Sequence, residues 1–179
     1  YNAAVAHANA ALADAAKPTV ALIRGICFGG GFGLAMSCDL RLATEESRFR
    51  IPAAKVGLGY GYAGVEALVR RIGMAGVAEL LLSARIFDAT DALRYQIIHR
   101  LWPRADFEEK ADVYLAEMGA NAPLTLQAVK RALVELARPE MEREPAAAEA
   151  LVAKCFESLD YQEGQRAFLE KRPPVFRGI

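Results

Sequence analysis

The stretch Gly29-Gly30-Gly31-Phe32-Gly33 restricts the fold of this chain more than any other part of its sequence. It follows a run typical of a buried β-strand, Thr19–Arg24, and precedes a run typical of a helix, Leu34–Cys38. A glycine turn lets the chain enter a helix directly from a strand. Because the first amides of a helix have no carbonyl partner, they converge on one point and suit an anion, including a short-lived oxyanion. If the anion is short-lived, the stretch forms half of an oxyanion hole. The alternative is a tight strand-to-helix turn that binds no ligand.

Composition and charge exclude several classes of partner. The chain has 179 residues, normal for one domain, and its 22 Lys and Arg balance its 22 Asp and Glu. This balance gives no basic surface for nucleic acid, and no apolar run approaches the roughly 20 residues that span a membrane. Cys27, Cys38 and Cys155 are odd in number and widely spaced, which indicates buried free thiols in a reducing, cytoplasmic compartment. His7 and His99 are too few for a zinc site or a histidine-based triad, so we expect no metal.

Local patterns predict an α/β core followed by helices. Strand-like and helical runs alternate up to Pro103, and amphipathic helical patterns follow, so we expect domain parts over 1–103 and 104–179. The expected strands are 19–24, 41–43, 48–51 and 97–101, with a glycine-rich loop over 56–64. The expected helices are 2–16, 32–40, 65–71, 74–83, 88–95, 106–119, 123–137, 140–159 and 160–172.

Two stretches around the glycine turn resemble a family signature. Lys17-Pro18-Thr19-Val20-Ala21, followed by the glycine turn and then Cys38-Asp39, closely resembles the enoyl-CoA hydratase/isomerase (crotonase) superfamily. The resemblance implies an α/β spiral of ββα turns with a helical C-terminal trimerisation region. It also implies a coenzyme A thioester as substrate, no separate cofactor, and a homotrimer or homohexamer. Members of the family are longer at the N-terminus, and this chain begins at Tyr1 without Met, so we expect it to be partial.

The resemblance assigns the anion site but leaves its acids missing. The Gly30 amide matches one donor of the family's oxyanion hole. The resemblance also places Gly29 and Gly31 in contact with the substrate. The second donor of the family comes from a segment upstream of Lys17. Hydratases of the family place two carboxylates at the positions of Gly33 and Ala53, which here would only line the substrate. Some isomerases and dehalogenases use an Asp at the position of Gly61. None of these positions carries a carboxylate in this sequence.

The loop Leu58-Gly59-Tyr60-Gly61-Tyr62 looks most like the methylmalonyl-CoA decarboxylase branch, where a Tyr at the position of Tyr60 lies beside the departing carboxylate. Decarboxylation of a malonyl-type thioester needs a stabilised enolate and no general base to start it, which fits the missing acids. A phenol can orient a carboxylate through a hydrogen bond. The alternative for Tyr60 is that its ring packs beside Tyr62 and holds the loop. We therefore expect decarboxylation of a short malonyl- or methylmalonyl-type thioester.

Other residues keep further functions open. Glu66 follows the loop and could act as a surrogate acid, although its apolar neighbours favour an ordinary surface position; with it, a hydratase or isomerase remains the alternative. Phe168 and Lys171 resemble a pair that contacts the coenzyme A of a neighbouring subunit, where the ring would stack on adenine and the cation would pair with phosphate. The alternative is that Phe168 packs between helices and Lys171 is a solvated surface residue. A CoA-binding or assembly subunit without catalysis is the third alternative.

Asp39 is expected to make a structural hydrogen bond at a helix end. Gln96 replaces a frequent family glycine, and we expect a different helix cap there.

Overall fold

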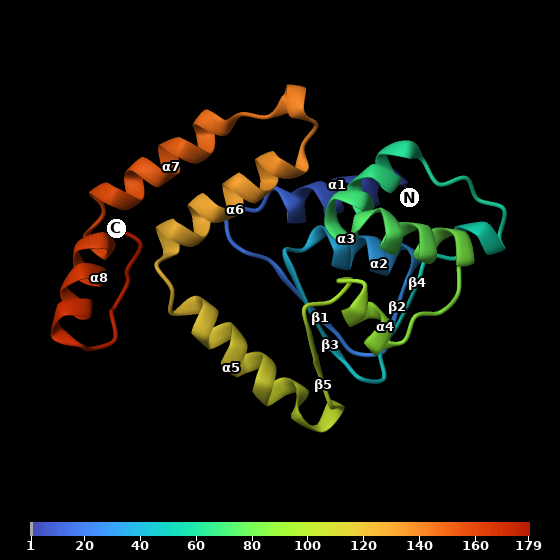
Figure 1. Ribbon diagram of the computed structural model, residues 1–179, viewed down its shortest axis with the longest axis horizontal. Coiled ribbons are helices and arrows are strands. Elements are labelled where there is room, and N and C mark those ends of the chain that lie inside the picture. The colour runs from blue at the N-terminus through green and yellow to red at the C-terminus, as the bar shows by residue number, and fades with distance from the viewer. Residues whose placement is uncertain (1) are drawn as a thin grey trace. The chain divides into compact units, whose positions relative to one another are not determined.

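Five short strands make up the β-structure in the computed structural model, which describes residues 2–179 (Figure 1). β1 (Val20–Ile23), β3 (Leu40–Thr44) and β5 (Arg100–Trp102) form a parallel sheet in the order β1-β3-β5, and β2 (Ile26–Phe28) pairs in parallel with β4 (Arg48–Arg50). Parallel neighbours cannot be joined by a tight hairpin. The chain therefore crosses back between paired strands, and helices occupy most of these crossovers.

The central strand β3 fixes the register of the larger sheet. Its Leu42 lies opposite Leu22 of β1 and opposite Arg100 of β5. Leu42 and Ala43 are fully buried, as expected for a parallel strand that is covered on both faces.

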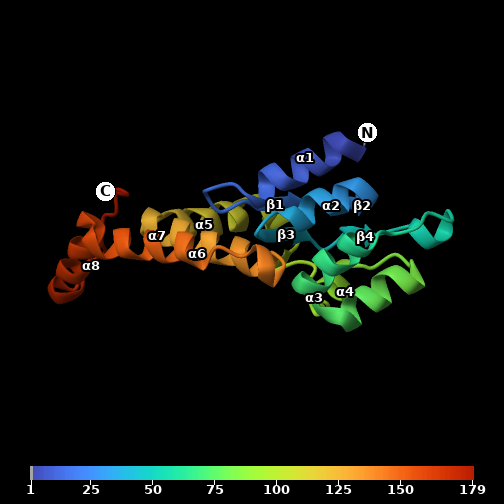
Figure 2. The same cartoon turned by 90° about the horizontal axis from the view of Figure 1, so that it is seen from above.

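The helices of the first part of the chain are α1 (Asn2–Ala13), α2 (Gly29–Ser37), α3 (Tyr62–Ser83) and α4 (Ala89–Arg94), with a short 3₁₀ turn η1 (Ala53–Lys55). Figure 2 shows α1 along α2, and the two helices pack against each other. α3 is interrupted at Gly73, whose φ of 73° and ψ of 163° are not helical. The predicted break between two helices at Gly73 is therefore confirmed.

The residues form two compact units, one over 2–15 with 19–111 and the other over 16–18 with 112–179. The core of the first unit packs side chains of α2, the strands and α3 together. Cys27 and Cys38 are buried thiols, whereas the Cys155 thiol in the second unit is half-buried. The division of the chain into domain parts over 1–103 and 104–179 stays a prediction. The largest fully buried apolar residues of the first unit's core are Phe32, Phe49, Phe87, Leu80, Ile97 and Ile98.

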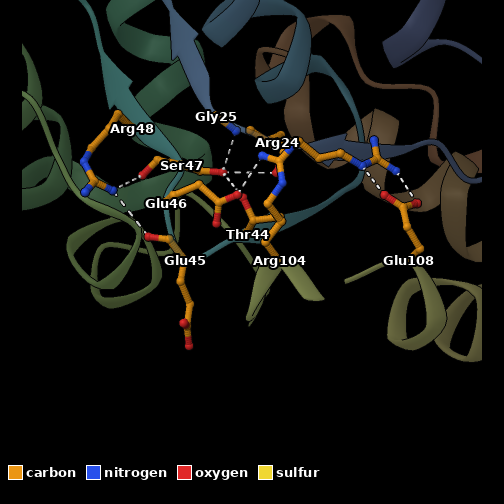
Figure 3. A network of polar contacts seen from close by, with 10 residues as sticks. Arg24, Gly25, Thr44, Glu45, Glu46, Ser47, Arg48, Arg104 and Glu108 are labelled. Carbon is orange, nitrogen blue, oxygen red and sulfur yellow. Dashed lines mark hydrogen bonds and ion pairs between the residues drawn. The ribbon is translucent and has the colours of Figure 1, made fainter. Parts of the chain in front are cut away.

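A buried hydroxyl ties β1 to the turn before β4 (Figure 3). Ser47 accepts a hydrogen bond from the Gly25 amide (3.2 Å), donates to the Ile23 carbonyl (3.1 Å) and contacts the Thr44 hydroxyl (3.0 Å). Gly25 has φ +100°, a conformation that side chains with a Cβ avoid. The network therefore sets the direction in which the chain leaves β1 and enters β2.

Two ion pairs flank this network. Arg24 binds Glu108 through both its Nε and its Nη2, and Arg104 binds Glu46 (2.9 Å). Both pairs are exposed, and exposed ion pairs contribute little to stability because solvent screens them. The buried Ser47 contacts are therefore the stronger restraint on the chain here.

Several predicted elements differ from the structure. α2 begins at Gly29 and ends at Ser37, not at 32 and 40, because Leu40 already pairs in β3. The sequence pattern does not predict β2, because a strand of three residues between two glycines is too short to show an alternating hydrophobic pattern. β5 starts at Arg100, because the helix cap that follows α4 takes up residues 96–98.

Gln96 adopts the left-handed conformation itself, with φ +59°, so the expectation of a different cap is wrong. Its amide donates to the Leu93 carbonyl (3.1 Å), and the Ile97 amide donates to the Ala92 carbonyl (2.8 Å). This pair of hydrogen bonds is the Schellman motif that usually carries glycine. Burial of Ile97 and Ile98 just beyond the cap holds the chain in this conformation.

The second unit is helical. α5 (Phe107–Gly119) leads into it, and α6 (Pro123–Ala137), α7 (Pro145–Glu157) and α8 (Leu159–Glu170) follow. The predicted helix over 140–159 is therefore too long. Proline is best accepted in the first helical turn, so Pro145 starts α7. The remaining short 3₁₀ turns are η2 (Arg104–Asp106) and η3 (Glu140–Glu142).

Buried carboxylates hold the helices of the second unit together. Glu135 of α6 accepts a hydrogen bond from the Glu144 amide (2.6 Å) and pairs with Arg131 (2.7 Å). Asp160 of α8 accepts from the amides of Arg177 and Gly178, both at 2.7 Å, and so fixes the C-terminal segment. Among residues 2–179, no helix is long and apolar enough to cross a membrane.

We expect Gln96→Gly to raise the free energy of unfolding by about 0.5–1 kcal/mol, because glycine reaches positive φ without a steric cost. Gln96→Ala is the matched control, since alanine keeps the Cβ and gains nothing. Urea unfolding of both variants measures the difference. A Gln96→Gly variant no more stable than Gln96→Ala would show that the Gln96 side chain itself stabilises the cap.

Glu163 makes the second unit sensitive to acid. Hydrogen bonds from Arg172 (2.6 Å) and the Val175 amide (3.0 Å) lower the pKa of its carboxyl from 4.5 to about 2. Because the folded pKa lies below the unfolded one, its contribution to stability is complete above pH 4.5 and is lost as the pH falls toward 2. We expect the free energy of unfolding of Glu163→Gln to fall less between pH 4.5 and 2 than that of the unmodified protein, as measured by urea unfolding at each pH. The exposed Glu149→Gln variant is the control and should lose as much stability as the unmodified protein.

Candidate active site

The N-terminal end of α2 presents unpaired amides to solvent. The chain leaves β2 at Phe28 and turns at Gly29, whose φ is +52°. The amides of the first helical turn have no carbonyl one turn earlier, and the residue that precedes α2, Phe28, provides no capping side chain. Gly30 and Gly31 are exposed. These amides lie at the positive end of the helix dipole, so together they can hold an anionic oxygen.

The other end of α2 is fixed to β1 by Asp39. Its carboxylate accepts hydrogen bonds from the Thr19 amide (2.7 Å) and the Thr19 hydroxyl (3.0 Å). The Asp39 amide in turn donates to the Thr19 carbonyl (3.0 Å). The predicted structural hydrogen bond at this helix end is confirmed. It restrains the helix that carries the free amides.

A buried guanidinium also holds the C-terminal end of α2. Arg41 is 3% exposed and donates to the carbonyls of Cys38 (2.8 Å) and Ile97 (2.5 Å). Burial, and then the nearby charge of Arg71, lowers the pKa of Arg41 to about 10, so the side chain stays charged at neutral pH. A cation suits the negative end of a helix dipole. The sequence pattern does not indicate this role of Arg41, because a charged residue within a strand pattern carries no signal that it is buried.

The structure places no carboxylate at positions 33 and 53. Gly33 lies on α2 opposite α1, where a Cβ atom built on it would be 3.8 Å from the side-chain nitrogen of Asn9. Ala53 is 7% exposed, and its carbonyl accepts hydrogen bonds from the amides of Val56 (3.2 Å) and Leu58 (3.0 Å). Neither side chain can transfer a proton. Their predicted contact with substrate stays a prediction.

Tyr60 packs against the first turn of α3. A Cβ atom built on Gly64 would lie 2.9 Å from the Tyr60 ring, so the ring covers this glycine closely. Tyr60 is 40% exposed, and burial raises the pKa of its phenol, which keeps it protonated at neutral pH. Tyr62 is 82% exposed. The ring therefore has a packing contact with Gly64, and the active-site role of Tyr60 stays a prediction.

Glu66 follows the first turn of α3 and pairs with Arg70 on the same helix at 2.9 Å. Both side chains are partly exposed, 37% for Glu66 and 29% for Arg70. Exposed pairs of this spacing are weak, at about 0.3–0.5 kcal/mol, so the carboxylate can be released from Arg70. Its role as an acid stays a prediction. Among residues 2–179, no three His, Cys, Asp or Glu side chains are grouped so that they could hold a metal ion.

Phe168 and Lys171 belong to the second unit. Phe168 is 83% exposed and borders a cavity of about 400 Å³ whose other lining residues include Tyr161 and Phe176. Lys171 ends α8 in the left-handed conformation, with φ +54°. Both side chains are therefore placed where another molecule could reach them, and their predicted contact with coenzyme A stays a prediction.

Comparison with known proteins gives consistent matches over nearly the whole chain. A family model described as enoyl-CoA hydratase/isomerase matches residues 1–178. A Thermus thermophilus protein provisionally named an enoyl-CoA hydratase is 38% identical over 162 residues, 89% of this chain and 63% of its own length. The (E)-benzylidenesuccinyl-CoA hydratase of Thauera aromatica is 33% identical over 162 residues, 90% of this chain and 63% of its own length. The chain thus spans less than two thirds of both curated relatives.

Solved structures agree with these sequence matches. The crystal structure of an enoyl-CoA hydratase/carnithine racemase from Magnetospirillum magneticum superposes with a TM-score of 0.88 at 29% sequence identity. The match covers 100% of this chain and 66% of that chain. The mixed α/β architecture with small parallel sheets is therefore shared with solved enoyl-CoA hydratases.

Proposed function

Because the chain belongs to the enoyl-CoA hydratase/isomerase family, we propose that it binds an acyl-CoA thioester and stabilises the enolate oxygen of that thioester at the N-terminal end of α2. The observation that carries this proposal is the uncapped, exposed first turn of α2 at Gly30 and Gly31. Preorganised backbone amides aimed at a developing oxyanion are usually the largest single contribution to such reactions. Coenzyme A is part of the substrate, and the proposal requires no separate cofactor.

The reaction best supported is the addition of water to a 2-enoyl-CoA, or its removal, since both curated relatives described above are named as hydratases. The water oxygen bonds to the β-carbon, the electron pair of the double bond moves onto the thioester oxygen, and the α-carbon then takes a proton. Glu66 is the proposed acid–base group. Its carboxylate takes a proton from the water and returns one to the α-carbon, which balances the step.

Decarboxylation of a malonyl- or methylmalonyl-type thioester is the second candidate. The specific observation in its favour is that Gly33 and Ala53 carry no ionisable group, whereas loss of CO₂ leaves the enolate without any proton transfer. The protonated phenol of Tyr60 would then orient the departing carboxylate. In both reactions the α2 amides hold the same oxyanion.

We also propose that the protein acts in the cytoplasm as a homotrimer or homohexamer. Helices of the second unit expose large apolar side chains, and contiguous exposed apolar surface usually marks an interaction site. Phe168 and Lys171 would then meet the coenzyme A of a neighbouring subunit. The most exposed large apolar residues of α6, α7 and α8 are Leu136, Phe156, Leu159, Phe168 and Leu169.

Replacing the Gly30 amide tests the oxyanion site. We expect Gly30→Pro to lower kcat of the full-length protein by about 10²–10³-fold, because it removes one donor at a helix position that accepts proline. Gly30→Ala keeps the amide and is the matched control. Circular dichroism verifies that both variants fold. A folded Gly30→Pro variant as active as Gly30→Ala would remove the Gly30 amide from the mechanism.

A side-by-side assay of the full-length protein decides between the reactions. With crotonyl-CoA we expect loss of the enoyl absorbance, and with methylmalonyl-CoA we expect no CO₂ release. The Glu66→Gln variant should lose hydration, and Tyr60→Phe should retain it. CO₂ release without hydration, lowered in Tyr60→Phe, would instead establish the second candidate and leave Glu66 a surface residue.

A further inference from the structure

One buried polar atom near the proposed site lacks a hydrogen bond. The side-chain oxygen of Asn9, on α1, is shielded from solvent and has no hydrogen-bond partner within residues 2–179. The nitrogen of the same carboxamide lies 3.8 Å from the place that a Cβ atom on Gly33 would occupy. A buried polar atom without a partner is rare in folded proteins, and an unseen water or ligand is a common explanation. Asn9 therefore lies beside α2, and its side-chain oxygen can still accept a hydrogen bond.

The residue type at this position lowers the stability of the helix. Asn9 stands between Ala8 and Ala10 in an alanine-rich helix, and alanine is the better helix former. Burying a carbonyl oxygen without a hydrogen bond is unfavourable as well. An alanine at position 9 would avoid both costs. A polar residue that costs stability in this way is typical of a functional site.

Asn9 is also close to the anion site along α2. Gly33 follows Gly30 by three residues, and residues with this spacing share one face of a helix. Gly33 has no side chain to fill the space between α2 and the Asn9 carboxamide. Because the atom without a partner is an acceptor, its partner must be a donor, and water is the donor that the proposed reaction uses.

We propose that the side-chain oxygen of Asn9 binds a water molecule next to the thioester held at α2 and orients it for addition to the double bond. Asn9 is then a positioning residue, since a neutral carboxamide accepts a hydrogen bond from water and takes no proton. This inference rests on the proposed hydration. It adds the group that places the water, while Glu66 moves the protons.

Kinetics of variants on α1 test the inference in the full-length protein. We expect Asn9→Ala to lower kcat for crotonyl-CoA hydration by about 10–100-fold with KM changed less than about threefold, because the water is no longer oriented. Its melting temperature should stay the same or rise. Asn9→Asp keeps an acceptor oxygen and should retain more activity than Asn9→Ala. His7→Ala, at an exposed position of the same helix, is the control and should match the unmodified protein.

The alternatives give different results. A melting temperature that falls together with activity in Asn9→Ala would show a structural role and overturn the inference. Unchanged activity would overturn it as well. A crystal structure of the protein provides a readout that does not need turnover: we expect an ordered water about 2.7–3.2 Å from the Asn9 oxygen. If no hydration is detected but this water is present, the proposed reaction fails while water binding at Asn9 stands; a protein donor on that oxygen would overturn the inference in either case.

Discussion

The structure of the first unit depends on how a strand becomes a helix at Gly29. A positive φ at this residue lets β2 lead directly into α2, so the first helical amides are reached without a capping side chain. A cap would satisfy these amides internally and would block an anion. The same conformation therefore determines the path of the chain and leaves the first amides of α2 without a capping side chain. Further contacts hold α2 along its length.

Those contacts restrain α2 from its buried face and from its far end. Phe32 and Met36 pack in the core, while Asp39 binds Thr19 and Arg41 binds the Cys38 carbonyl. A helix that is held at its end and along one face cannot drift relative to β1. Fixed amides need no reorganisation when charge develops on a substrate, and this is the physical basis of oxyanion stabilisation.

Part of this could be predicted from the sequence. The glycine turn and the break at Gly73 follow from local residue chemistry, because each depends on neighbours along the chain. The structural role of Asp39 follows instead from the family resemblance of Cys38-Asp39, because its partner Thr19 lies 20 residues earlier in the chain. The Gln96 cap could not be predicted, since burial of Ile97 and Ile98 overrides the preference for glycine. The Asn9 oxygen was also missed. Its environment arises only when α1 packs on α2, and a single Asn in an alanine-rich helix has no periodic signal.

The central claim is that the α2 amides hold the thioester oxygen, and the structure of a complex tests it most directly. A crystal structure of the full-length protein with an unreactive acyl-CoA thioester would locate this oxygen. We predict that it lies about 2.7–3.1 Å from the Gly30 amide nitrogen. A thioester bound elsewhere, with the Gly30 amide facing solvent, would contradict the account.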